Sequence, residues 1–278
     1  LNAEAVRLAI IASLAVGCQV QERSVFARKN YFYPDLPKGY QISQFDQPLA
    51  TAGRLAIDAD RGARTVGITR VHMEEDAGKN LHGGGHSIVD LNRAGTPLIE
   101  IVGEPDLRSP AEARDYMRRL HAILMFTGVN DGNLEQGSFR CDANVSIRKR
   151  GEVTFGTRVE MKNINSFRFV HDAIEVEIRR QIRLVERGGA VVQQTRGYNS
   201  DKRESYRLRD KEGDAGYRYF PEPDLPPLLL DSGDIDAIAT ALPELPVAKR
   251  LRYVTELGLS DLAAGVMMSH PRVAELFE

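Results

Sequence analysis

The sequence predicts an α+β fold, a mostly antiparallel sheet with packed helices, followed by the start of an all-α domain. Several short segments alternate apolar and polar residues, which is typical of strands with one buried face. Two longer segments repeat apolar residues at helical spacing, and only short helical patterns follow Asp231. We therefore expect a sheet-containing domain over residues 1–231 and a helical region over residues 232–278, which agrees with about two domains for 278 residues.

Composition and charge exclude several classes of protein. The 37 Lys and Arg residues balance 39 Asp and Glu residues, which excludes a polycation that coats nucleic acid non-specifically but allows a local basic patch. Two cysteines, Cys18 and Cys141, are too few for a disulfide framework or a four-ligand zinc site. The longest apolar stretch, residues 8–16, is much shorter than the ~20 residues of a membrane helix, and the start lacks signal-peptide features. These features favour a cytoplasmic protein with no membrane partner.

Periodicity and capping signals define the elements of the first half. Apolar residues four positions apart predict a core-facing helix over residues 2–16. The segment Ser109-Pro110-Ala111-Glu112 is a capping box with proline at the first helical position, so a helix is expected from there to about Thr127. Strands are expected over residues 65–72, 87–91 and 98–102.

Residues 29–49 are rich in aromatic side chains and contain three prolines, which exclude a regular helix. They predict an ordered loop with a short strand around Ile42. Two interpretations stay open for this loop. In the first, buried rings only anchor it; in the second, it offers charge and stacking to a nucleotide or polynucleotide through Arg28, Lys29, Tyr31 and Tyr33.

A hairpin is expected over residues 139–163, with a turn at residues 149–152. Its two strands alternate so that one face is apolar and the other polar. Short Asp and Asn side chains are disfavoured in strands unless something binds them, which favours a functional surface over a merely polar exterior. This face carries Asp142, Asn144, Glu160 and Lys162, followed by Asn163.

The second half begins with a long helix over residues 166–187, capped by Ser166 and ended by two glycines. A Gly- and Arg-rich loop is expected over residues 195–220, followed by a rigid, extended, proline-rich segment. Short helices are expected over residues 243–256, 260–269 and 271–278.

The fingerprints of phosphate loops, serine hydrolases and zinc proteases do not occur in this sequence. The residues that remain as candidates for chemistry are carboxylates on or beside the expected strands. Carboxylate oxygens suit Mg²⁺, which prefers oxygen ligands and usually accompanies a substrate phosphate. The residues alone therefore indicate a magnesium–nucleotide enzyme. The candidate carboxylates are Glu74, Glu75, Asp76, Glu100, Glu104, Asp142 and Glu160. The candidate counter-cations are Lys79, Arg140, Arg158, Lys162, Arg209 and Arg218.

Five long segments carry a family resemblance: RVHMEEDAGKNLH, VDLNRAGTPLIEIVGEPDLRSPAEA, GNLEQGSFRCDANVSIR, EMKNINSF and YRYFPEPDLPPL. In this order they resemble the B subunits of aspartyl/glutamyl-tRNA(Asn/Gln) amidotransferases. The resemblance implies a cradle-shaped catalytic domain that works in a heterotrimer with an amidase-type A subunit and a small C subunit. It also implies ATP and Mg²⁺ as cofactors, and phosphorylation of the side-chain carboxylate of misacylated Glu-tRNA(Gln) or Asp-tRNA(Asn). Ammonia from glutamine then displaces the phosphate.

The resemblance further implies roles for individual residues. Glu74 and Glu75 belong to the metal and to the mouth of an ammonia channel, where Lys79 helps to gate or deprotonate the ammonia. The implied metal ligands are Glu74, Glu75, Glu100, Asp142 and Glu160. The implied catalytic residues are Glu74, Glu75, Lys79, Glu160 and Lys162. The implied ATP-binding residues are Arg140, Asn144, Asn163, Arg209 and Arg218.

The resemblance also implies parts outside this chain: an N-terminal strand with further metal ligands, a zinc-binding insertion, and a C-terminal tail domain that grips tRNA. The cognate aminoacyl-tRNA synthetase is a further implied partner. Two other functions stay open from the residues: an ATP-dependent ligase for a free small carboxylate, and a non-catalytic tRNA-binding scaffold. Dependence on aminoacylated tRNA separates the first from the amidotransferase, and binding of Mg–ATP separates the second.

Overall fold

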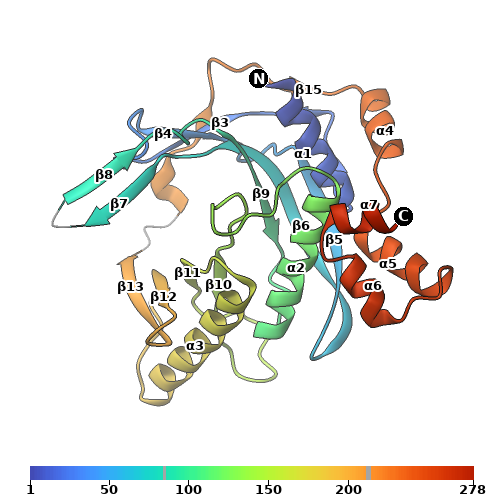
Figure 1. The fold of residues 1–278 in the computed structure, drawn as a ribbon. Coiled ribbons are helices and arrows are strands. Elements are labelled where there is room, and N and C mark those ends of the chain that lie inside the picture. Colours follow the sequence, from blue (N-terminus) through green and yellow to red (C-terminus); the bar gives the residue numbers. More distant parts are fainter. Residues whose placement is uncertain (84–85, 211–213) are drawn as a thin grey trace.

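A computed structural model describes residues 1–83, 86–210 and 214–278 and confirms the α+β fold class. Two four-stranded sheets are each covered by a long helix, and smaller strand pairs lie at the edges (Figure 1). The first sheet is antiparallel, with the order β1-β5-β6-β9. Its strands are β1 (Gln19–Val20), β5 (Ala50–Ala59), β6 (Gly62–Glu75) and β9 (Pro97–Gly103).

Two helices build the core of the first sheet, α1 (Ala3–Ala15) and α2 (Pro110–Phe126). Val16 at the end of α1 and Leu120 of α2 pack against Ile68 and Val71 of β6 in one buried cluster. Gly53 permits the close approach of β5 to the end of α1, because a Cβ atom there would lie 2.3 Å from the Cys18 sulfur. The predicted first helix and the strands around residues 65–72 and 98–102 are confirmed.

The second sheet has the order β10-β11-β12-β13 and is covered by α3 (Phe167–Glu186). The predicted hairpin is confirmed, with Asn144 opposite Glu160 in its antiparallel register. The loop predicted over residues 195–220 is wrong, because β12 pairs in parallel with β11 and in antiparallel fashion with β13. The strands are β10 (Ala143–Val145), β11 (Val159–Lys162), β12 (Gln194–Asn199) and β13 (Glu204–Asp210).

Gly197 explains why this segment reads as a loop in the sequence. It lies opposite Tyr206 in the β12–β13 pair, and a Cβ atom at Gly197 would lie 2.4 Å from the Tyr206 ring. The tyrosine therefore covers the glycine across the two strands. A residue that is typical of turns is here a packing site within a sheet.

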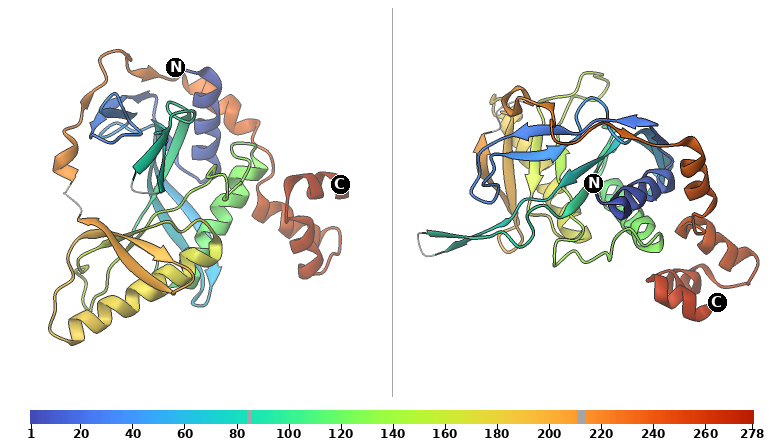
Figure 2. Two further views of the ribbon diagram at one scale, coloured as in Figure 1. Left: turned by 60° about the vertical axis from the view of Figure 1, so that its left-hand side comes forward. Right: turned by 90° about the horizontal axis from the view of Figure 1, so that it is seen from above.

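The smaller strand pairs lie at the edges of the body. A three-stranded sheet has the order β14-β3-β4, β15 pairs with β2, and β7 pairs with β8 in a hairpin that extends away from the rest of the fold (Figure 2). The expected strands around Ile42 and over residues 87–91 are confirmed. Their bounds are β2 (Arg23–Ser24), β3 (Ala27–Asn30), β4 (Tyr40–Ser43), β7 (Lys79–Gly83), β8 (His86–Asp90), β14 (Phe220–Pro221) and β15 (Leu228–Leu229).

Short helices follow the sheets, as expected, although the first of them was not predicted. Ile238 of this first helix packs with the core around α1, and Leu245 packs with the core of the first sheet. The boundary near Asp231 stays a prediction. No helix in the described ranges is long and apolar enough to cross a membrane. The helices are α4 (Ser232–Thr240), α5 (Pro246–Thr255), α6 (Asp261–Met267) and α7 (Pro271–Phe277), and a 3-10 turn, η1, covers Asp214–Tyr217.

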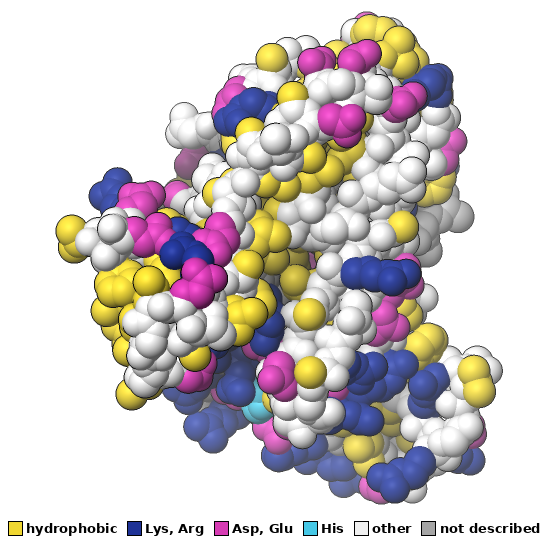
Figure 3. All heavy atoms as spheres, turned by 90° about the vertical axis from the view of Figure 1, so that its right-hand side faces the viewer, with side chains coloured by type: hydrophobic (Ala, Val, Ile, Leu, Met, Phe, Trp, Pro, Cys, Tyr) yellow, Lys and Arg dark blue, Asp and Glu magenta, His cyan; other side chains and the backbone are white. Residues whose placement is uncertain are grey.

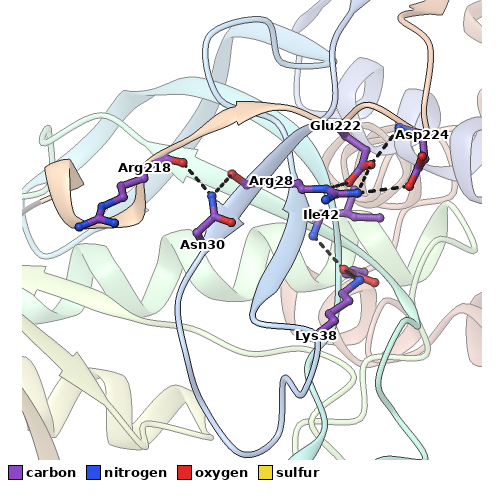
Figure 4. Close-up of polar contacts among 8 residues, drawn as sticks. Arg28, Asn30, Lys38, Ile42, Arg218, Glu222 and Asp224 are labelled. Atoms are coloured by element: carbon purple, nitrogen blue, oxygen red, sulfur yellow. Dashed lines mark hydrogen bonds and ion pairs between the residues drawn. The ribbon is translucent and has the colours of Figure 1, made fainter.

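An ion pair fastens the extended segment after η1 to strand β3 (Figure 4). Arg28 donates two hydrogen bonds to Glu222, at 2.7 and 2.9 Å, and a third to Asp224 at 3.2 Å. The Glu222 side chain is only 2% exposed, and that of Arg28 is 20% exposed. The Arg28 guanidinium also lies 4.2 Å from the centre of the Tyr40 ring. Arg28 thus makes a structural contact, and its role toward a nucleotide stays a prediction.

Replacing Glu222 by Gln should lower the midpoint of thermal unfolding by about 3–8 °C at pH 7, because a buried charge-assisted pair is lost. The Arg28 guanidinium holds the pKa of Glu222 below its ordinary value of 4.5. The stabilisation is therefore complete above that ordinary value and is lost as the pH falls through the lowered one. The gap between wild type and E222Q should begin to narrow as the pH falls below about 4.5 and should close below the lowered pKa of Glu222.

Glu4→Gln is the matched control, since Glu4 makes a similar ion pair with Arg7 on the exposed surface of α1. Exposed pairs contribute little, so E4Q should unfold within about 2 °C of wild type. Equal effects of E222Q and E4Q in differential scanning fluorimetry would contradict the role given to the Glu222 pair.

Candidate active site

A β-bulge in strand β6 determines which of its side chains face the site. Val66 and Ile68 are core residues at even positions, whereas Val71 and Met73 are core residues at odd positions. The register with β9 shifts between Ile68 and Arg70, where two residues of β6 oppose one of β9. The extra residue rotates the following side chains by one position. Beyond the bulge, the face away from the core carries Arg70, His72 and Glu74.

The neighbouring strand accommodates the bulge at the same level. In β5 the core positions likewise shift between Ala50 and Gly53, and Ala52 between them adopts a φ of +57°. On β6, Thr69 donates a hydrogen bond of 2.6 Å to Glu104, and the Gly67 N–H donates one of 2.9 Å to Asp106. These side chains hold the irregular backbone in place.

Three side chains on this face converge on one point. His72 Nε2 lies 3.1 Å from Glu74 Oε1 and 3.4 Å from Glu100 Oε2, and Glu100 lies directly opposite His72 on β9. Within the described residues, this is the one group of three His, Cys, Asp or Glu side chains whose donor atoms all lie within 4.8 Å of one another. His72 and Glu74 are buried, whereas the Glu100 side chain is 50% exposed and opens the cluster to solvent.

Strand β4 supplies the partners that fix Glu74. Ser43 donates a hydrogen bond of 2.7 Å to Glu74 Oε1, and Gln41 donates one of 3.1 Å to Oε2. Both donors are buried. A buried carboxylate with a partner on each oxygen has a fixed orientation, as the ligand of a metal requires.

His72 and Glu100 each have a shifted pKa. Burial lowers the pKa of His72, but its hydrogen bonds to Glu100 and Glu74 outweigh burial, so the pKa is raised above its ordinary value. The hydrogen bond from His72 in turn lowers the pKa of Glu100 to about 2. Glu100 is therefore ionised at neutral pH, and the exposed side of the cluster is suited to a cation.

The donor set fits a divalent metal ion. Two carboxylates are the protein ligands that Mg²⁺ commonly takes when it keeps positions for water and substrate phosphate, and exposed Glu100 leaves such positions accessible. The imidazole is a nitrogen donor, which also suits ions such as Mn²⁺. Glu74, Glu100 and His72 would therefore hold the ion.

The structure places Glu75 and Lys79 apart from this cluster. Glu75 pairs with Lys38 and accepts a hydrogen bond of 2.8 Å from the Ile42 N–H of β4. Lys79 is exposed at the start of the β7–β8 hairpin. Metal ligation by Glu75 and gating by Lys79 stay predictions.

The predicted polar face of the second sheet forms as a separate cluster. Lys162 Nζ lies 2.6 Å from Asp142 Oδ2 and 4.0 Å from Glu160 Oε1, and Thr195 donates a hydrogen bond of 2.8 Å to Glu160. Asn144 lies opposite Glu160. In the part of the chain that the structure describes, Asp142 and Glu160 do not join the His72 group within 4.8 Å.

Asp76 connects the two sheets. It follows β6 directly, and its Oδ2 lies 2.9 Å from Arg93 Nε and 2.8 Å from Arg140 Nη2. Arg140, which was expected to bind phosphate, leads into β10 and is held by this buried carboxylate. Its role toward ATP stays a prediction.

The remaining predicted ATP ligands lie on the β11–β13 side and on the segment after η1. Asn163 adopts a φ of +62° and donates a hydrogen bond of 3.2 Å to the Tyr206 hydroxyl. Arg218 is exposed, and its carbonyl accepts a hydrogen bond of 2.7 Å from Asn30 (Figure 4). The side chain of Arg209 lies outside the described part of the structure. ATP binding by these three residues stays a prediction.

Sequence reasoning missed His72, Ser43 and Gln41. A signal for His72 was present, because Arg70, His72 and Glu74 alternate with apolar residues in a strand. Ser43 and Gln41 carry no such signal, since only the packing of β4 beside β6 brings them to Glu74.

Comparison with known proteins identifies the family. A family model described as the GatB/GatE catalytic domain matches residues 1–236. The chain belongs to this family. It is 57% identical over 281 residues to a protein of Alkalilimnicola ehrlichii and to one of Halorhodospira halophila, and 56% identical over 283 residues to one of Geobacter sulfurreducens. Each of the three is named as the B subunit of an aspartyl/glutamyl-tRNA(Asn/Gln) amidotransferase. Each alignment covers 100% of this chain and 59% of the relative, so the chain spans about three fifths of their length.

Replacing Glu74 by Gln should weaken Mn²⁺ binding at least ~10-fold in this GatB/GatE domain, because the variant loses a charged ligand that β4 holds in place. Asp142→Asn is the matched control and should leave the affinity within about twofold, since Asp142 is paired with Lys162 outside the cluster. Electron paramagnetic resonance of free Mn²⁺ measures both. An equal loss in D142N would instead show that the two clusters share one metal.

Proposed function

We propose that this chain is the catalytic part of a tRNA-dependent amidotransferase B subunit. It uses Mg–ATP to phosphorylate the side-chain carboxylate of Glu-tRNA(Gln) or Asp-tRNA(Asn), and ammonia derived from glutamine then converts the acyl phosphate into an amide. The observation that carries the proposal is the cluster of His72, Glu74 and Glu100 in a chain of the GatB/GatE catalytic family.

The chemistry explains why such a cluster is needed. A carboxylate does not accept ammonia as a nucleophile, because it carries negative charge and has no leaving group. Transfer of the ATP γ-phosphoryl group forms a bond between phosphorus and a carboxylate oxygen, and ADP leaves. Ammonia then attacks the carbonyl carbon, phosphate leaves with the C–O electron pair, and the nitrogen loses a proton. A bound Mg²⁺ would neutralise the negative charge that collects when ATP meets the carboxylate.

The described residues suit the positioning part of this reaction. Both carboxylate oxygens of Glu74 accept hydrogen bonds from side chains of β4, which fix the orientation of this carboxylate in the site. Glu100 lies at the exposed side, where an incoming phosphate would meet the cluster. In the proposal, the polar face of the second sheet binds the nucleotide, with Lys162 and Asn144 on one surface beside Glu160.

The surface charge supports an RNA substrate. Figure 3 shows Lys and Arg side chains gathered over the lower part of one face, at the level that α3 and the tip of the β5–β6 hairpin occupy in Figure 1. Arg61 at this tip, Arg179 and Arg183 of α3, and Arg187 at the C-cap of α3 are exposed. Such a patch on a chain of net charge −2 favours contact with a phosphate backbone. The remaining proposed partners are the amidase-type A subunit, the small C subunit and, transiently, the cognate synthetase.

The metal cluster disfavours the other two functions. A tRNA-binding scaffold has no need for a buried His–Glu pair with an exposed third carboxylate. A ligase for a free small carboxylate needs the same cluster but not the basic face. Dependence of phosphoryl transfer on aminoacylated tRNA therefore separates the amidotransferase from the small-molecule ligase.

The test is transfer of labelled γ-phosphate from ATP to Glu-tRNA(Gln) and Asp-tRNA(Asn), with the full-length chain supplied with its A and C subunits. The wild-type complex should label aminoacylated tRNA and neither free glutamate nor free aspartate. E74Q should lower the transfer rate ~100-fold or more, since a metal ligand is lost. Glutaminase activity should persist because it resides on another subunit.

Two further variants make the result specific. Glu256→Gln changes an exposed carboxylate at the end of α5 and should behave as wild type. If Glu75 acts only through Lys38 and Ile42, Glu75→Gln should lower the transfer rate less than E74Q does. If Glu75 also binds the metal, the two variants should lower the rate equally. Labelling of free amino acid without tRNA would contradict the proposed function.

A further inference from the structure

Arg70 is a cation on the same strand face as the His72 cluster. The bulge before it places Arg70, His72 and Glu74 at alternate positions, and Arg70 lies opposite Val102, two residues along β9 from Glu100. Diagonal neighbours on one sheet face are within reach of long side chains. The charge of Arg70 also acts on both Glu100 and the nearby Tyr219. Arg70 is therefore part of the surface of the cluster.

Arg70 differs from the candidate cations Arg140 and Lys162 because its charge is not paired with a resident carboxylate. Its buried Nε has no hydrogen-bond partner among the described residues, and no carboxylate of the described chain forms an ion pair with it. Arg140, by contrast, is held by Asp76, and Lys162 is held by Asp142. A partly buried guanidinium whose N–H donor has no partner costs free energy, unless a ligand accepts a hydrogen bond from that donor. This arrangement indicates a site for an anion.

The surroundings of Arg70 define what kind of anion fits. Negative charge already lies on one side, at Glu74 and Glu100, and a metal ion there would be shared with the anion. Lys29 of β3 adds a second positive charge near Glu100, and its Nζ lies 4.9 Å from the centre of the Tyr217 ring. A metal, an arginine and a lysine around one point suit a phosphate group better than a single carboxylate.

We propose that Arg70 binds the phosphoryl group that passes from ATP to the substrate carboxylate, with its planar guanidinium on the non-bridging oxygens. This inference rests on the proposed function and adds a catalytic residue to it. During transfer the bond between the γ-phosphorus and the bridging oxygen of ADP breaks, and a bond from the carboxylate oxygen to phosphorus forms. Arg70 keeps all its protons and offsets charge on the equatorial oxygens, as an arginine does in other phosphoryl transfers.

The position of Arg70 separates this role from one in folding. A structural arginine would have a carboxylate or carbonyl partner, as Arg28 has in Glu222. The proposed role requires that no protein carboxylate pairs with the guanidinium, so that a phosphate can bind there. It also requires that the cation lie on the same strand face as the cluster. The bulge fulfils the second requirement, since without it the side chain at position 70 would lie on the core face of β6.

The experiment compares Arg70→Ala with Arg54→Ala in the full-length complex with its A and C subunits. Arg54 is an exposed arginine on the neighbouring strand β5. R70A should lower kcat for γ-phosphate transfer on the order of 100-fold, with the KM for aminoacyl-tRNA within about threefold of wild type. Added guanidinium ion should restore part of the R70A rate and leave R54A unchanged. Glutaminase activity and the thermal unfolding midpoint serve as controls of integrity.

Arg70→Lys covers the case in which R70A does not fold. A lysine keeps the charge but lacks the planar fork, so its kcat should fall about 10-fold at an unchanged unfolding midpoint. Wild-type kcat in both variants, or a loss in R70A that R54A shares, would overturn the assignment of Arg70 while leaving the proposed function intact. Absence of γ-phosphate transfer in the wild-type complex would overturn the proposed function itself.

Discussion

The bulge between Ile68 and Arg70 is the constraint on which the site depends. Strand side chains alternate strictly, so a regular β6 would carry the even positions of Val66 and Ile68 into the core throughout. One extra residue exchanges the faces, which buries Val71 and Met73 and releases the polar positions to the other side. A single local irregularity thus makes a long core strand compatible with a charged cluster.

The cluster is held by elements that are far apart in the sequence. Glu100 comes from β9 and the partners of Glu74 come from β4, and the charges of both glutamates act on Tyr219 in the segment after η1. That segment is fastened to β3 by the Arg28–Glu222 pair, and β3 is paired with β4. The segment after η1 is therefore linked through β3 to β4, the strand that fixes the orientation of Glu74.

The sequence predicted most of the fold, because helices with caps and alternating strands are encoded locally. The helix after Ser109, the helix after Ser166 and the hairpin carrying Asn144 and Glu160 all form as expected. The β12–β13 pair was missed because Gly197 is needed for packing on Tyr206, a contact with no local signature. In the site, Glu74 and Glu100 come together, and the bulge also turns His72 toward them. Its trace in the sequence is small: the apolar residues change from even positions at Val66 and Ile68 to odd positions at Val71 and Met73.

Charge pairing divides the cations of this chain into two kinds. Arg140 and Lys162 have carboxylate partners at 2.8 and 2.6 Å, so their charge is already largely offset before any ligand arrives. Such pairs position backbone and side chains, and a phosphate that reaches them must compete with a resident carboxylate. A cation without a resident partner, beside ionised Glu100, gains far more from an incoming anion and metal together. Preorganised charge of this second kind contributes most to transition-state stabilisation, because it needs no rearrangement when the reaction occurs.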